Sequence, residues 1–192
     1  MTRYMNNTIE TILRRRSIRA YEPRQLEEDE LNTILQAGQY APSAMGQQPW
    51  HFTVIEYHDK LETLQSACKN VFLYSDNAAL RETAAKDGYH VFYHAPMLLI
   101  ISADSYAVAP REDCVLAMEN MLLAAASLGI ASCWVHSPII LYQSAGGPQT
   151  FAEIGVRFPE GHQPYASAVF GYSAKPWPDA APRKPGTVTR IG

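Results

Sequence analysis

The chain has 192 residues, of which 47% are hydrophobic and 18% charged, and its formal net charge is −3. This length and composition fit one globular domain with a sizeable apolar core. A weakly acidic chain is a poor nucleic-acid binder, no apolar run is long enough to span a bilayer, and the first residues lack the apolar core of a signal peptide. We therefore expect no nucleic-acid partner, no membrane and a cytoplasmic location.

The first predicted helix runs from Thr8 to about Arg15, with Asn6 or Asn7 as its cap, because its apolar residues recur at helical spacing. The pattern then changes to period two, so that Arg15, Ser17 and Arg19 point to one side of an extended segment. Guanidinium forks and a hydroxyl suit a phosphate. Two alternatives stay open: a solvated helix end whose cations favour the dipole, and a nucleic-acid contact.

The remaining elements alternate between helices and strands along the chain. We predict helices over residues 27–40, 59–70, 77–86 and 110–128 and a helical stretch from Pro138, with strands over 50–57, 96–103, 131–136 and 166–171. The run 96–103 is continuously apolar, which is typical of a fully buried strand. This order predicts helices on both faces of a modest mixed sheet.

Two segments outside these elements invite a functional interpretation. The loop 41–49 sets two prolines around small residues and amides, so it is either a plain connection or a source of donors for a flat polar ligand. The tail 172–192 is rich in proline and basic residues but carries Tyr172, Trp177 and Ile191. These apolar residues favour an arm lying on another surface over a frayed end.

Cysteine and histidine spacing gives no metal motif. Cys68, Cys114 and Cys133 are odd in number and far apart, which indicates reduced thiols rather than a disulfide framework or a zinc site. His90 and His94 are four residues apart on a possible helix, a spacing that suits a metal, but no partner carboxylate motif accompanies them. We therefore predict no metal site.

Three stretches carry a family resemblance in order and spacing. They are Arg15-Arg16-Ser17-Ile18-Arg19, the loop and strand start from Ala41-Pro42-Ser43 to Gln48-Pro49-Trp50-His51-Phe52, and Gly129-Ile130-Ala131-Ser132-Cys133-Trp134, with a closing Phe170-Gly171-Tyr172 and Arg183-Lys184-Pro185. Together they resemble the signatures of the nitroreductase family of flavin enzymes. The resemblance implies an α+β, three-layer fold, with a mixed, mostly antiparallel sheet flanked by helices, in an intertwined homodimer. Residues 1–171 would form the FMN-binding domain, and residues 172–192 the arm that crosses to the partner subunit.

The resemblance also implies a cofactor site, with FMN bound and NADH or NADPH as reductant. Cofactor contacts would come from these residues: Arg15, Arg16, Ser17, Arg19, Pro42, Ser43, Ala44, Gly46, Gln48, His136, Ser137 and Arg183. Arg15, Ser17 and Arg183 would hold the phosphate, Arg19 would lie by the pyrimidine edge as electrostatic support, and the segment 136–137 would approach flavin N5. The loop residues would reach the ring system from the other subunit.

Two positions depart from the family pattern. Gly46 stands where the family usually has asparagine, a loss for which Gln47 or Gln48 could compensate, and His136 stands where many members have glycine or glutamate. The segment 70–94 matches no family position. The implied activity passes electrons from NAD(P)H through FMN to a nitroaromatic, quinone or similar flat acceptor, with no side chain needed as acid or base. The alternatives are another flavin reaction on a dedicated metabolite, such as dehalogenation, flavin fragmentation or dehydrogenation, and a flavin-binding protein without turnover.

Overall fold

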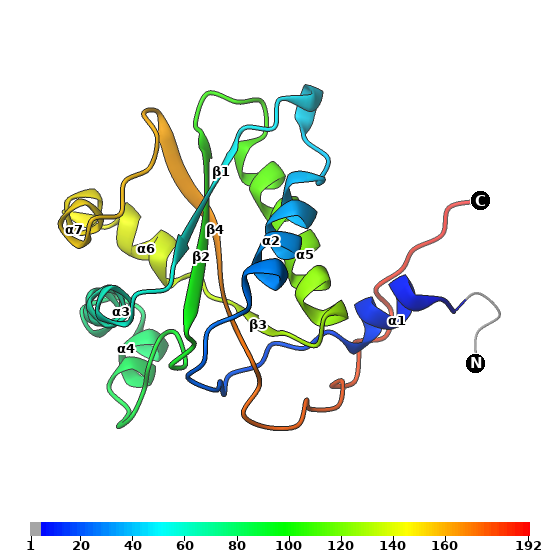
Figure 1. Cartoon of the computed structure of the whole chain (residues 1–192), viewed down its shortest axis with the longest axis horizontal. Helices are drawn as coiled ribbons and strands as arrows, with labels where there is room; N and C mark the ends of the chain where they lie inside the picture. The colour runs from blue at the N-terminus through cyan, green and yellow to red at the C-terminus, as the bar shows by residue number, and fades with distance from the viewer. Residues whose placement is uncertain (1–4) are drawn as a thin grey trace.

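The computed structural model describes residues 5–192, in which a four-stranded sheet lies between two layers of helices (Figure 1). The strands are β1 (Trp50–Ile55), β2 (Met97–Asp104), β3 (Ala131–Trp134) and β4 (His162–Gly171). The helices are α1 (Asn7–Arg14), α2 (Glu28–Gln39), α3 (His58–Leu73), α4 (Ala78–Ala84), α5 (Pro110–Ser127), α6 (Ser137–Gln143) and α7 (Gly147–Ile154), and a 3₁₀ turn, η1 (Ala44–Gly46), follows α2.

The sheet has the order β1-β2-β4-β3, and each neighbouring pair runs antiparallel. Parallel pairing in the described part of the chain is limited to one isolated bridge between Ser17 and Ser132, beside β3. The mixed sheet expected from the sequence is thus an antiparallel sheet with one parallel bridge at its edge. The apolar run predicted as a buried strand is β2, whose residues 97–103 are all buried.

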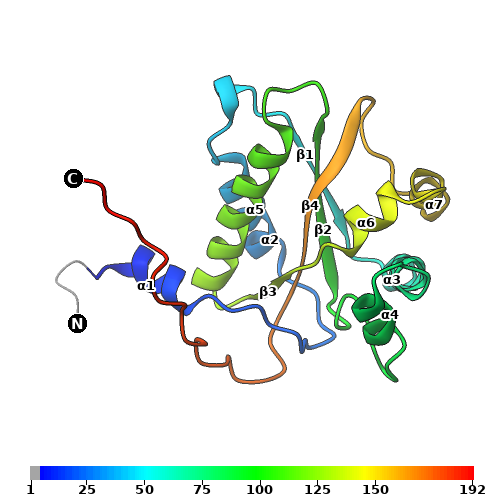
Figure 2. The same cartoon turned by 180° about the vertical axis from the view of Figure 1, so that it is seen from behind.

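Side chains of β2 alternate between two apolar cores. Leu98 and Ile100 face the core that is covered by α3, α4, α6 and α7, whereas Leu99 and Ile101 face the core that is covered by α2 and α5. Figures 1 and 2 show these two helical layers on opposite sides of the sheet. The predicted three-layer α+β architecture is therefore confirmed.

Two elements differ from the sequence prediction. The helical stretch from Pro138 is two helices, because Gly146 and Gly155 take left-handed conformations that bound α7. Strand β4 begins at His162, before the predicted residue 166. Its first residues include Pro164, which pairs beyond a register shift at Ile101/Ser102 of β2, and such an irregularity accommodates a residue without an N–H.

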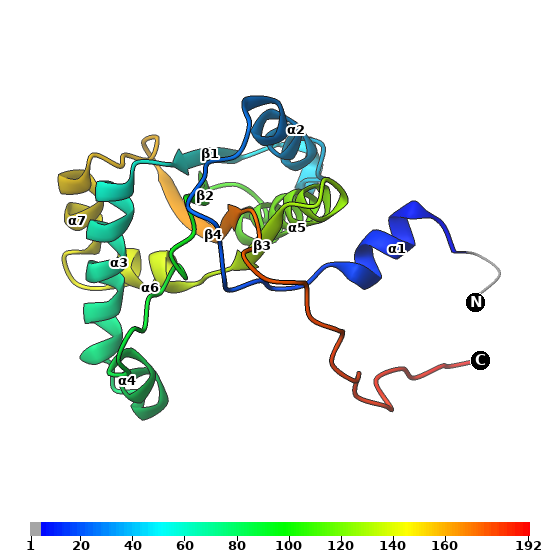
Figure 3. The same cartoon turned by 60° about the horizontal axis from the view of Figure 1, so that its bottom comes forward.

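Helix α1 and the C-terminal tail lie at the edge of the molecule (Figure 3). No residue of α1 is buried, and its Ile12 and Leu13 are 46% and 57% exposed. The tail passes α1 at Trp177, whose ring lies 6.0 Å from the guanidinium carbon of Arg14. Beyond it, Val188 and Ile191 are exposed. Among the helices of residues 5–192, none combines the length and apolarity needed to cross a lipid bilayer.

Candidate functional site

The basic segment after α1 is extended, as the change of period predicts. Helix α1 ends at Arg14, and the backbone of Arg15 takes ψ 132°. The Ile18 N–H donates to the Ser132 carbonyl at 3.0 Å, which ties the segment to β3, and the Ile18 side chain is buried. Alternate side chains in an extended segment point in opposite directions, so the residues on either side of Ile18 face away from the core.

Arg15, Ser17 and Arg19 lie around the thiol of Cys133 in β3. Burial raises the pKa of that thiol, while Arg19, the Ser17 hydroxyl and Arg15 each act in the opposite direction. Ser17 forms a parallel bridge with Ser132, the residue before Cys133, and Arg15 and Arg19 flank Ser17 on the same side of the extended segment. The structure brings together three of the side chains that the sequence assigned to an anion.

Arg16 behaves differently from its neighbours. Its Nη1 donates to the carbonyls of Leu13 and Arg15, both at 2.7 Å, and its Nε is buried without a partner among the described residues. The guanidinium therefore satisfies carbonyls at the C-terminus of α1, where a cation is favoured. This arrangement argues against Arg16 as a phosphate ligand.

Arg19 is held by a residue that the sequence analysis did not single out. Its Nε donates to the Tyr93 hydroxyl at 3.3 Å, its guanidinium carbon lies 5.6 Å from the ring centroid of Tyr93, and its Nη1 donates to the Ser17 carbonyl at 3.3 Å. The hydrogen bond to Tyr93 raises the pKa of Arg19, so the side chain is a fixed cation. Tyr93 lies in the segment that matches no family motif, and no sequence signal marks it.

Arg15 has a weak competing partner. Its Nε lies 3.8 Å from Glu119 Oε1 on α5, and the two side chains are 25% and 51% exposed. A long, solvated ion pair of this kind contributes about 0–1 kcal/mol. The guanidinium of Arg15 is therefore available to an incoming anion.

The loop after α2 has an unusual and well-anchored backbone. Met45, Gly46 and Gln48 have φ of 54°, 66° and 48°. The Gln48 N–H donates to Ser43 Oγ at 3.0 Å, so the turn is closed by its own side chain. Glycine and asparagine both tolerate left-handed backbone, so the conformation of Gly46 is one that the family's asparagine can also adopt.

A buried carboxylate anchors this loop to α5. The Ala44 N–H donates to Asp113 Oδ1 at 3.0 Å, and Asp113 is 2% exposed. Sequence analysis placed Asp113 only within a long helix. Acidic residues are common in the first turn of a helix because they interact favourably with the helix dipole. The sequence therefore gave no indication that Asp113 also anchors the loop.

Within one chain, this loop and the basic segment are attached to different parts of α5. Ala44 bonds to Asp113, whereas Arg15 reaches Glu119 and Arg14 Nη2 bonds to the Ala126 carbonyl at 3.0 Å. At 1.5 Å per helical residue, these anchors are about 9–20 Å apart along the axis. Figure 1 shows η1 beyond one end of α5 and α1 near the other.

His136 and Ser137 follow β3, on the same chain as the basic segment. The His136 side chain is exposed, with its ring 6.4 Å from that of Trp134, and burial together with Arg111 lowers its pKa. Ser137 is 4% exposed, and its hydroxyl is buried without a hydrogen-bond partner among the described residues. The Ser137 side chain therefore does not face a ligand at the surface.

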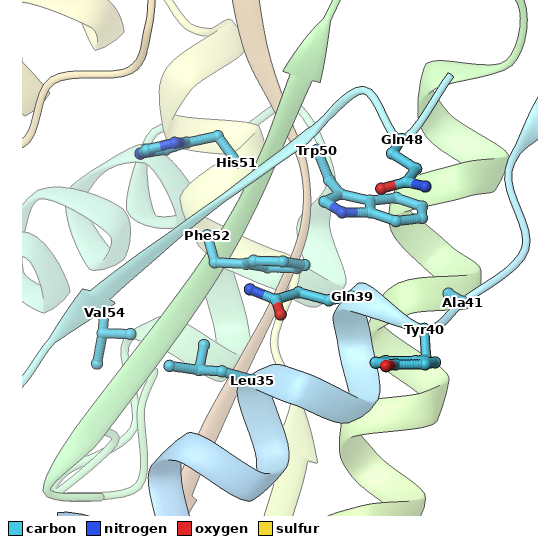
Figure 4. Close-up of a pocket in the computed structure, with 9 residues that line it drawn as sticks. All are labelled: Leu35, Gln39, Tyr40, Ala41, Gln48, Trp50, His51, Phe52 and Val54. Atoms are coloured by element: carbon cyan, nitrogen blue, oxygen red, sulfur yellow. The ribbon is translucent and has the colours of Figure 1, made fainter. Parts of the chain in front are cut away.

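The other predicted residues are exposed. Pro42 lies at the surface before η1, and Arg183 lies in the exposed tail, where no hydrogen bond or ion pair within residues 5–192 joins it to Arg15. A hollow of about 860 Å³ beside β1 includes Gln48, next to Trp50 (Figure 4). Its lining has no lysine or arginine, so we place an anion at the basic segment and not in this hollow.

Comparison with known proteins identifies the family. The model of the Nitroreductase family matches residues 12–172. The chain belongs to the nitroreductase family. A protein from Archaeoglobus fulgidus, provisionally named an NADH dehydrogenase/NAD(P)H nitroreductase, is 34% identical to this nitroreductase-family chain over 134 residues, which are 68% of each protein. The FMN reductase (NADPH) of Bacillus subtilis is 28% identical over 141 residues, 68% of this chain and 54% of that protein.

Solved structures of family members agree with the fold. A nitroreductase with bound FMN from Bacteroides fragilis is 40% identical and superposes with a TM-score of 0.87, covering 98% of this chain and all of that one. A nitroreductase from Desulfitobacterium hafniense gives the same TM-score at 24% identity, which extends the likeness in fold alone. The family predicted from three short motifs is therefore confirmed.

Proposed function

We propose that this chain is an FMN-dependent oxidoreductase that accepts electrons from NADH or NADPH and delivers them to a nitroaromatic, quinone or similar flat acceptor. The observation that carries the proposal is the extended segment that holds Arg15, Ser17 and Arg19 on one side and is tied to β3 at Ser132. Arg15 and Ser17 supply a guanidinium and a hydroxyl that can both donate to a dianionic phosphate, and Arg19 adds a second cation on the same side of the segment. The FMN bound by the Bacteroides fragilis relative carries such a phosphate.

In this proposal the chain's own residues bind and polarise the cofactor. When bound, FMN supplies the hydride and electron chemistry. Arg15 and Ser17 hold the phosphate, and Arg19 places a fixed cation near the pyrimidine edge, where negative charge develops on reduction. His136 and the backbone of Ser137 border the ring, and no side chain is required as a proton donor.

We further propose that the site is completed by a second copy of the chain. Pro42, Ser43, Ala44 and Gly46 would reach the ring from the partner, since their loop is anchored about 9–20 Å from the basic segment along α5 of the same chain. The exposed apolar side chains of α1 and α5 support such an interface, and they include Ile9, Ile12, Leu13, Val115 and Leu116.

The C-terminal tail takes part in the same proposal. Residues 1–171 form the FMN-binding domain, and residues 172–192 form an arm that crosses to the partner and brings Arg183 to the phosphate. Exposed Val188 and Ile191 support this role, because they have no burial within their own chain.

A second candidate keeps the cofactor and changes the substrate. His136 is exposed beside Trp134, at the position where the family pattern usually places glycine or glutamate. An imidazole there could select one metabolite for dehalogenation, flavin fragmentation or dehydrogenation.

The purified protein gives a direct test. We expect a flavin absorption spectrum, release of FMN on denaturation, and bleaching on anaerobic titration with NADH or NADPH. Rapid reoxidation by nitroaromatics and quinones supports the first candidate, whereas fast turnover of a single metabolite with slow turnover of that panel supports the second. A colourless protein that does not take up FMN would refute both.

A further inference from the structure

We propose that Glu62, His94 and His58 form a binding site for a divalent transition-metal ion of the Zn²⁺ type, with His90 as the group that orients Glu62. These residues lie on α3 and on the turn that follows α4, where His94 comes directly after Tyr93, the hydrogen-bond partner of Arg19. The proposal does not depend on FMN binding.

The fold brings a carboxylate to the two histidines, although no sequence motif places one beside them. Glu62 comes from α3, and its carboxylate lies within 4.8 Å of ligand atoms of both His90 and His94, which are themselves within 4.8 Å of each other. Ligands of one Zn²⁺ ion lie about 2.0–2.2 Å from the metal, and so roughly 3–3.5 Å from one another. A small side-chain adjustment is enough for Glu62 and His94 to meet at one ion.

The hydrogen bonds of His90 define its part in the site. Its Nδ1 accepts from the backbone N–H groups of Phe92 at 3.1 Å and His94 at 3.3 Å. The ring proton is therefore on Nε2, which lies 3.0 Å from Glu62 Oε1 and donates to it. Such an outer hydrogen bond orients a metal-binding carboxylate and leaves its other oxygen for the ion.

His94 is held in place at a conformational cost. Tyr93 and His94 have φ of 56° and 55°, a left-handed conformation that non-glycine residues rarely adopt. The two hydrogen bonds to His90 Nδ1 stabilise this turn, and the ring of His94 contacts that of His90, with centroids 3.9 Å apart and the ring planes tilted by 38°. The strained turn thus presents an exposed imidazole next to Glu62.

A pocket of about 340 Å³ provides a candidate for the third ligand. Its lining includes Glu62, His90, His94 and also His58, which precedes Glu62 by four residues on α3 and therefore shares its helix face. No lysine or arginine lines this pocket, and Lys69, which lowers the pKa of His90, donates instead to the Tyr89 carbonyl at 3.2 Å. Imidazole and carboxylate ligands favour Zn²⁺ and its neighbours over Mg²⁺.

The test is calorimetric titration of the untagged, EDTA-treated, FMN-loaded protein with Zn²⁺ alone. We expect one Zn²⁺ per chain and a melting temperature about 5–10 °C higher at a hundredfold excess over Kd. Glu62→Gln, His94→Ala and His58→Ala should each weaken binding at least tenfold. The matched control, His162→Ala, should bind as the parent does, and Mg²⁺ should cause no shift.

Circular dichroism and melting in EDTA establish that each variant is folded, so that a loss of binding reports on the ligand. Unchanged Zn²⁺ affinity in any of the three variants, or an equal loss in His162→Ala, would overturn the proposal. So would the absence of binding below 1 mM total Zn²⁺, or an equal response to Mg²⁺, which takes oxygen ligands.

Discussion

Arg15→Ala tests the proposed phosphate site most directly. A charge-assisted hydrogen bond to a phosphate contributes about 1.5–3 kcal/mol. The existing contact of Arg15 with Glu119 is 3.8 Å long and solvated, so giving it up on ligand binding costs at most about 1 kcal/mol. The net loss in Arg15→Ala is about 0.5–3 kcal/mol, which raises the Kd for FMN about 2- to 150-fold.

Two matched variants make this result specific. Arg16→Ala removes the adjacent guanidinium, whose Nη1 is already bonded to the carbonyls of Leu13 and Arg15. It should lower the free energy of unfolding by about 1–2 kcal/mol and leave FMN affinity within about threefold. Glu119→Gln removes the competing carboxylate and should leave FMN affinity unchanged or slightly tighter.

The assay is quenching of FMN fluorescence on titration of the apoprotein, with urea unfolding as the measure of stability. Equal weakening by Arg15→Ala and Arg16→Ala would show that only net local charge matters. Unchanged affinity in Arg15→Ala would remove that residue from the site and refute the alternation argument that placed it there.

Four other outcomes follow from the structure. Tyr93→Phe removes the acceptor of Arg19 Nε, so the flavin reduction potential should fall while FMN affinity changes by less than about threefold; an unchanged potential would count against Arg19 as a fixed cation. Truncation before Trp177 should weaken the proposed dimer in sedimentation, and an equally stable dimer would refute the crossing arm. Asp113→Ala leaves the Ala44 N–H without its acceptor and should cost about 1–3 kcal/mol in urea unfolding, whereas Asp113→Asn should cost less. The three buried thiols have raised pKa values, about 12 for two of them, so little thiolate exists at pH 8 and disulfide reagents should react fully only after denaturation; rapid labelling of the native protein would contradict their burial.

Hydrophobic periodicity predicted most of the helices and strands, because the buried residues of this chain recur with the period of the helix or strand that contains them. The continuous apolar run became the central strand β2, and the change from period 3.6 to period two marked the end of α1 within one residue. The predicted element boundaries were wrong where glycine or proline interrupts the hydrophobic periodicity. Gly146 and Gly155 divided one helical stretch into two, and Pro164 hid the first part of β4.

The candidate site could be predicted only in part from the sequence, because the direction of each arginine side chain depends on where α1 ends. Alternation separates Arg15, Ser17 and Arg19 from Ile18, but it also puts Arg16 on the opposite side, where the carbonyls at the end of α1 take up its guanidinium. A motif that names all three arginines does not make that distinction. The distinction follows from where α1 ends, and so from local hydrogen bonding that the motif does not describe.

Contacts between distant segments were beyond any sequence pattern. Tyr93 reaches Arg19 across 74 residues, and Asp113 holds Ala44 across 69. Tyr93 and Asp113 belong to no motif. The fold brings Tyr93 next to the basic segment and Asp113 next to the loop that follows α2. Tyr93 and Asp113 each hydrogen-bond to a residue of the family motifs, Arg19 and Ala44 respectively. The motifs therefore contain the groups proposed to contact the ligand, whereas residues outside the motifs hold those groups in place. Rigidity is what electrostatic support of a charged ligand requires, because a fixed cation needs no reorganisation when charge develops. Variants of these unmarked partners should therefore change the reduction potential and the loop geometry more than they change the affinity for FMN.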